Sequence, residues 1–136
     1  MLEILPPINE EDKFIAALSY PFWFVVSWLI LITDKKKEPF LFCHAYQSLF
    51  LGLFLTVATL LLFIIITLFF GLTSFMASMF TSFILLGTVL VLIVIVMAEF
   101  AILLYLAYMA SMGKMIRVPY IYKYVEKLYF KAFPQK

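Results

Sequence analysis

The chain has 136 residues, of which 66% are hydrophobic and 13% charged, and its mean hydropathy is +1.11. A soluble domain is roughly 45–50% apolar and about 25% charged, and a small one leaves much of its surface in water. These values exclude an ordinary soluble globular protein. They indicate an all-α membrane protein with a single membrane domain over residues 1–136.

The formal net charge of +2 conceals an uneven distribution. Residues 1–13 are acidic, with Glu3, Glu10, Glu11 and Asp12 against Lys13, whereas the tail from residue 114 to 136 is basic. The basic residues of the tail are Lys114, Arg117, Lys123, Lys127, Lys131 and Lys136. A basic end on an apolar body predicts contact with anionic lipid headgroups and no nucleic-acid partner. Cys43 is the single cysteine, which excludes an intramolecular disulfide.

The first predicted element is a transmembrane helix over residues 14–33. Asn9 offers an N-cap, and the acidic residues that follow complement a helix dipole. The segment then runs without a charge for a length of about 30 Å as a helix, which is one hydrocarbon thickness. Pro21 predicts a kink near Tyr20. A charged turn, Asp34 to Pro39, ends the segment.

Two further transmembrane helices are predicted at about 40–70 and 82–112. Residues 40–113 carry one formal charge, Glu99, and are too long for one span, so the chain must fold back. The region 71–81 is the best place, because glycine, serine and threonine cluster there. Gly113 suits the residue after a helix C-terminus. The sequence therefore predicts three spans.

The tail predicts an amphipathic helix that lies in the membrane surface. Its lysines recur every four residues, at Lys123, Lys127 and Lys131. The predicted apolar face holds Ile121, Val125, Leu128 and Ala132, with tyrosines at its margins. Basic residues favour the cytoplasmic side. We therefore expect a multi-pass protein of the cytoplasmic (inner) membrane. The turn that holds Lys35, Lys36 and Lys37 and the tail are expected inside, and the N-terminus and residues 71–81 outside. An arrangement with four spans would place the turn and the tail on opposite faces and is the less favoured one.

Glu99 has the highest predicted free-energy cost of insertion into the membrane, because its predicted depth is near the bilayer centre. Two interpretations stay open at this point. It is a proton- or cation-binding carboxyl, or a protonated structural residue that hydrogen-bonds Tyr20, Thr56 or a partner subunit.

His44 and Gln47 lie three residues apart on one face of the second predicted helix. With one histidine and one cysteine in the chain, hydrogen bonding is favoured over metal binding. No catalytic or phosphate-binding motif is present in the sequence, so we expect no enzyme activity, no cofactor and no metal.

Several motifs resemble those of the Tic-twenty-like family of small prokaryotic membrane proteins, a family of uncharacterised function related to a chloroplast inner-envelope import component. They are Pro39-Phe40, His44-Ala45-Tyr46-Gln47, Ala107-Tyr108, Gly113-Lys114 and Arg117-Val118-Pro119. The resemblance implies a three-helix core, a role for His44 and Gln47, and a place at a protein translocation site. Cys43 and Glu99 depart from the family pattern.

These patterns favour a non-enzymatic scaffold or accessory subunit that packs against other membrane subunits or against itself. One alternative is a component of a proton- or cation-coupled transporter or channel that uses Glu99. The other is a protein translocation or insertion factor.

Overall fold

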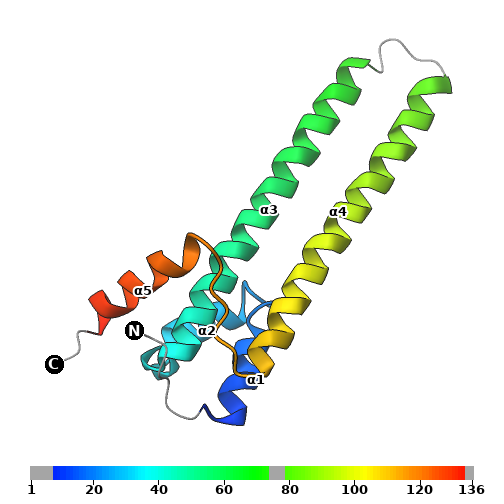
Figure 1. The fold of residues 1–136 in the computed structure, drawn as a ribbon. Helices are drawn as coiled ribbons and strands as arrows, with labels where there is room; N and C mark the ends of the chain where they lie inside the picture. Colours follow the sequence, from blue (N-terminus) through cyan, green and yellow to red (C-terminus); the bar gives the residue numbers. More distant parts are fainter. Residues whose placement is uncertain (1–7, 74–78, 134–136) are drawn as a thin grey trace. The chain divides into compact units, whose positions relative to one another are not determined.

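The computed structural model describes residues 8–73 and 79–133, and every regular element in this part of the chain is a helix (Figure 1). The chain divides into two compact units. One unit comprises residues 1–53 and 102–136, and we call it the terminal unit. The other comprises residues 54–101 and is called the hairpin unit. The helix α3 (Pro39–Thr73) and the helix α4 (Met79–Ser111) each contribute to both units.

The first helix, α1 (Glu10–Leu18), begins as the sequence predicts. Asn9 has an extended backbone at the N-cap, and its carbonyl accepts a 3.1 Å hydrogen bond from the amide of Lys13. Three acidic residues occupy the first turn. Their negative charges are stabilised by the exposed amides of a helix N-terminus.

The prediction of one continuous helix over residues 14–33 is wrong. Helix α1 ends at Leu18, the chain turns through residues 19–25, and α2 (Val26–Ile32) follows. Pro21 has no amide hydrogen and disfavours a helical conformation for Tyr20, so it ends the helix where a kink was predicted. The hydroxyl of Ser27 donates to the carbonyl of Ser19 across this turn at 3.3 Å. Helices of 9 and 7 residues are about 14 and 11 Å long, too short to cross about 30 Å of hydrocarbon.

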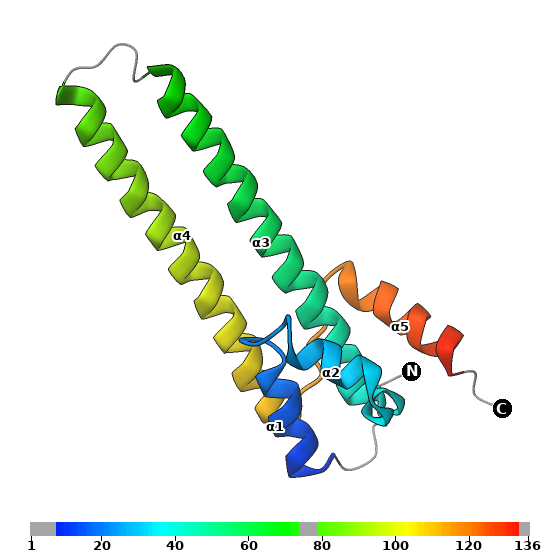
Figure 2. The same ribbon diagram turned by 180° about the vertical axis from the view of Figure 1, so that it is seen from behind.

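Figure 2 shows α1 and α2 as two separate short helices, and ion pairs join the two ends of the segment that they form. The 3₁₀ helix η1 (Asp34–Lys37) follows α2, and the ammonium of Lys35 lies 2.9 Å from carboxylate oxygens of both Glu11 and Asp12. These contacts favour a common side for residues 10–12 and the lysine turn, whereas the prediction places the N-terminus and this turn on opposite faces of a membrane. The orientation of the chain stays a prediction.

The helices α3 and α4 agree with the second and third predicted spans. Both are long and apolar enough to cross a membrane, which gives two candidate spans among the described residues, and a third is not confirmed. The predicted connection at 71–81 lies partly outside the described residues, at 74–78. At the other end of α4, Gly113 has φ +72° and its amide donates to Ala110, while the amide of Lys114 donates to Met109. This pair of hydrogen bonds is the Schellman C-cap that the glycine predicted.

The tail forms the predicted helix, α5 (Ile121–Ala132), and its buried face includes part of the predicted one but extends toward the tyrosines. Tyr122, Val125 and Tyr129 are buried, whereas Ala132 is exposed. Val125 and Tyr129 pack in one core cluster with Phe42 and Cys43 of α3. The tyrosines are core residues because their polar tips find partners, and the Tyr129 hydroxyl donates to the carbonyl of Lys37 at 3.2 Å.

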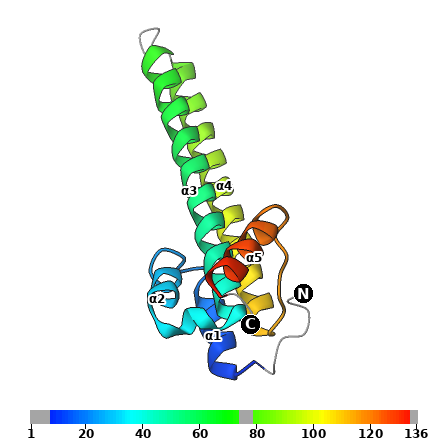
Figure 3. The same ribbon diagram turned by 90° about the vertical axis from the view of Figure 1, so that its left-hand side faces the viewer.

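The two units differ in the share of their apolar side chains that is buried. The core of the terminal unit draws on α1, α2, the beginning of α3 and the end of α4, and includes Ala16, Ile30, Leu41, Ala45 and Ala110. In the hairpin unit the two helices run alongside one another (Figures 1 and 3), and most of their apolar side chains are exposed. The most apolar stretches of α3 and α4 are 6% and 11% buried. Such helices need an apolar medium around them.

Candidate functional site

The terminal unit contains a buried polar cluster, made of Ser19, Tyr20, Ser27, His44, Gln47 and Ser48. All six side chains are fully buried. Buried polar groups are costly unless they hydrogen-bond, so their pairing decides what the cluster can do. Two of its contacts join the α1–α2 segment to α3.

The first contact joins Tyr20 to His44. The hydroxyl of Tyr20 lies 2.9 Å from Nδ1 of His44, and the two rings meet edge to face with centroids 5.8 Å apart. Phe40 covers the imidazole from its own helix, with a centroid distance of 4.4 Å. The turn at Pro21 delivers Tyr20 to this place. The structure therefore brings together two residues that the sequence singled out separately.

The second contact joins two serines that are 21 residues apart. The hydroxyls of Ser27 and Ser48 are 2.6 Å apart, and the carbonyl of Ala45 lies 3.0 Å from the Ser48 hydroxyl. Sequence reasoning noted neither Ser19 nor Ser27. Isolated serines in an apolar segment were the available signal, because a hydroxyl there requires a partner.

The buried polar cluster also contains side-chain atoms of Gln47 and His44 that make no hydrogen bond to the described residues. Among the residues that the structure describes, Nε2 of His44 and both amide atoms of Gln47 have no hydrogen-bond partner. The backbone of Lys114 lies near the imidazole but does not reach Nε2 in hydrogen-bonding geometry. A buried unpaired group costs about 1–3 kcal/mol. The cluster therefore holds unused donor and acceptor capacity next to a tightly bonded pair.

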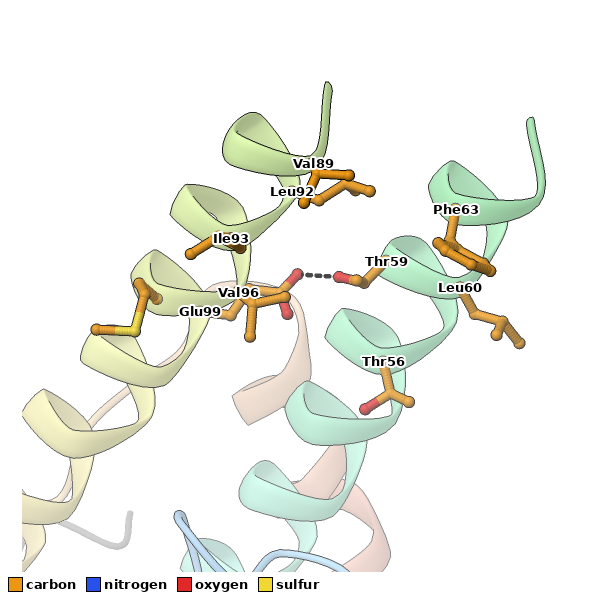
Figure 4. A pocket seen from close by; sticks show the side chains of 10 residues that line it. Thr56, Thr59, Leu60, Phe63, Val89, Leu92, Ile93, Val96 and Glu99 are labelled. Carbon is orange, nitrogen blue, oxygen red and sulfur yellow. Dashed lines mark hydrogen bonds between the residues drawn. The ribbon is translucent and has the colours of Figure 1, made fainter. Parts of the chain in front are cut away.

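Glu99 lies in the hairpin unit and has a partner that the sequence did not predict. The hydroxyl of Thr59 on α3 donates to Oε1 of Glu99 on α4 at 2.5 Å, and both residues are half-buried. Figure 4 shows the two side chains pointing toward one another, with Thr56 one turn away on α3. Of the alternative partners expected for Glu99, Tyr20 has its hydroxyl directed at His44 instead. Thr56 lines the same groove as Glu99.

That groove is an open depression of about 690 Å³ between α3 and α4. Its walls are apolar apart from Glu99, Thr56 and Thr59, and Phe63 and Met97 are among the residues that line it. The arrangement offers one carboxylate, held by a hydroxyl donor, to whatever occupies the groove.

The basic residues predicted to mark topology lie in the terminal unit and are separate from both sites. Hydrogen bonds from Lys35 to Asp12 and then to Glu11 raise the pKa of the Lys35 ammonium. Lys37 pairs with Asp34 at 2.8 Å. The remaining predicted basic residues are Lys36, which is half-buried, and Lys114, Arg117, Lys123, Lys127 and Lys131, which are exposed. No group of three histidine, cysteine, aspartate or glutamate side chains within the described residues could hold a metal ion.

In comparisons with protein-family models, curated proteins and solved structures, the chain matches none of them. The resemblance to the Tic-twenty-like family therefore stays a prediction.

Proposed function

We propose that this protein is a non-enzymatic integral membrane protein that serves as a small scaffold or accessory subunit of a membrane complex. The observation that carries the proposal is the exposed apolar surface of the hairpin unit. Side chains as large as Phe54, Leu68 and Val94 are 67%, 63% and 66% exposed, respectively. In a bilayer this surface meets lipid chains and the helices of other subunits.

The polar groups of the terminal unit support a structural role. Ion pairs, a Tyr–His pair and a Ser–Ser pair hold its segments together, and none of the six buried polar side chains is open to solvent. Enzymes that act on small molecules need convergent polar groups in a pocket that the substrate can enter. The terminal unit instead provides a firmly packed core, and the hairpin unit provides apolar surface for contact.

The ion pairs of Lys35 support a revised orientation for this role. With the lysine turn in the cytoplasm, residues 10–13 are cytoplasmic too, and the α1–α2 segment enters the membrane and returns without crossing it. The lysines of α5 then face the anionic headgroups of the inner leaflet. The chain crosses the cytoplasmic membrane twice, at α3 and α4.

Cysteine labelling tests this orientation. Asn9, Glu38 and Lys123 are exposed, so each is replaced singly by cysteine in a Cys43→Ala background. A membrane-impermeant maleimide should label all three from the cytoplasmic side of inverted vesicles and none from outside. Labelling of the Asn9 variant from the opposite face would restore the three-span arrangement.

Photocrosslinking tests the scaffold role. A photoreactive amino acid replaces Val94 on the exposed surface of the hairpin unit, and the matched control carries it at Tyr124, which is exposed on α5. We expect Val94 to give a discrete protein adduct in native membranes, with a partner subunit or a second copy, that also copurifies in mild detergent. Crosslinks of Val94 to lipid alone, with a monomeric protein after purification, would refute the scaffold role.

A further inference from the structure

Glu99 is an acidic group without a cation in its own unit. Between residues 54 and 101 the sequence has no lysine, arginine or histidine, and Glu99 is its sole formal charge. An ionised carboxylate surrounded by hydrocarbon costs several kcal/mol unless a positive charge compensates it. The compensating charge must come from outside the hairpin unit, as a proton or as a bound cation.

A hydrogen bond fixes the position of the Glu99 carboxylate, and the groove leaves it accessible to a proton or a cation. Thr59 donates its hydroxyl to one carboxylate oxygen, which fixes the side chain of Glu99 within the groove (Figure 4). The open groove places the acidic group where a ligand entering from the membrane can reach it.

The lining of the groove discriminates between kinds of cation. Calcium takes 6–8 oxygen ligands, and magnesium requires a near-ideal octahedron. The groove provides the Glu99 carboxylate and two threonine hydroxyls, while its remaining walls are apolar side chains. An organic cation needs one charge partner and apolar contact, and the Phe63 ring can add aromatic contact. A volume of about 690 Å³ lies within the range of sites for drug-sized molecules.

We propose that the groove of the hairpin unit binds a lipophilic organic cation, such as a substituted ammonium or phosphonium, in competition with a proton on Glu99. The cationic centre pairs with the Glu99 carboxylate, and its apolar substituents lie against the walls formed by α3 and α4. Thr59 positions the carboxylate. This inference is independent of the scaffold role.

The test is equilibrium binding of tetraphenylphosphonium to the full-length protein in nanodiscs of zwitterionic lipid, which removes headgroup attraction. We expect saturable binding of tetraphenylphosphonium that weakens as the pH falls, because a proton competes with the cation for the Glu99 carboxylate. Glu99→Gln should weaken binding by at least about tenfold, because it removes the charge and keeps an oxygen that accepts from Thr59. Glu38→Gln is the matched control, since it removes an exposed carboxylate outside the groove and should leave binding unchanged.

Tetraphenylborate supplies a second control on the unaltered protein, because it has the same shape and the opposite charge. Preference for the phosphonium supports the proposal even if Glu99→Gln fails to fold. Equal binding of the two ions would overturn it, and would make the groove an apolar surface for lipid chains or a second copy. Binding that Glu99→Gln leaves intact, or no saturable binding at any pH, would overturn it as well.

Discussion

The contact between Gly52 and Trp23 gives the sharpest test of the reversal at residues 19–25. Gly52 lies inside α3, and a Cβ atom built on it would lie 2.3–2.6 Å from three atoms of the Trp23 indole. Real side chains do not tolerate such distances. Gly52→Ala must therefore displace the indole, and with it the turn that carries Trp23.

The magnitude follows from two opposing effects. Alanine is favoured over glycine in a helix by about 1 kcal/mol, and overpacking a filled site costs about 1–3 kcal/mol. Gly87 in α4 is the matched control, because a Cβ there meets nothing within 4 Å. Since the propensity gain is common to both substitutions, it cancels in their difference. We expect Gly52→Ala to be less stable than Gly87→Ala by about 1–3 kcal/mol.

The assay is reversible unfolding in mixed micelles, followed by tryptophan fluorescence. The chain has two tryptophans, so a Trp28→Phe background leaves Trp23 as the reporter. We expect Gly52→Ala to lower the free energy of unfolding and to shift the emission of Trp23 in the folded state. Equal stabilisation by both substitutions, with unchanged emission, would show that Trp23 does not pack on α3.

Three further substitutions probe the buried polar cluster and the ion pairs. Tyr20→Phe removes the hydroxyl that bonds His44 and should lower the free energy of unfolding by about 1–3 kcal/mol, measured in the same micelles. Gln47→Met should be neutral or stabilising in that assay, because it removes two unpaired buried atoms; a loss as large as that of Tyr20→Phe would show that the amide has partners. Lys35→Met removes an exposed ion pair with Glu11 and a partly buried one with Asp12, and should cost about 0.2–1 kcal/mol at low salt. Its difference from the native protein should shrink in about 1 M salt, and a difference that salt leaves unchanged would contradict an electrostatic origin.

The long helices could be predicted from the sequence because length and the lack of charge decide them. A segment such as 40–70 has no alternative partner for its backbone in hydrocarbon, so it must be helical. The end of α4 was predictable for a local reason, since Gly113 adopts a positive φ at no steric cost. Local chemistry suffices in both cases.

The reversal of the first segment was missed because counting uncharged residues measures length and not direction. The twenty residues from 14 to 33 are sufficient for one span or for two short helices with a turn. Two signals favoured the turn: Pro21 near the middle, and charges of opposite sign at the two ends, Asp12 and Lys35. Opposite charges at both ends of an apolar segment can pair only if the segment doubles back, and they do so here at 2.9 Å.

The partners within the sites depended on how the helices lie against one another. Thr56 and Thr59 are three residues apart on α3, so both were within one turn of the predicted depth of Glu99. Which of them bonds the carboxylate depends on the register of α3 against α4, and sequence spacing does not determine that register. Similarly, Tyr129 was placed at the edge of α5 as a polar aromatic, whereas its contact with the Lys37 carbonyl allows the ring to be buried.

The polar residues of this chain serve two physical purposes, which the two units keep apart. In the terminal unit, Tyr20, Ser27 and Ser48 are fully buried, and their hydrogen bonds hold segments that are distant in sequence. Such groups set stability and leave little room for a ligand. In the hairpin unit, Glu99 is half-buried beside an open groove, and its bond to Thr59 involves only one of the two carboxylate oxygens. Substitutions in the buried polar cluster should therefore change the free energy of unfolding, and substitutions at Glu99 or Thr59 should change the affinity for the cation.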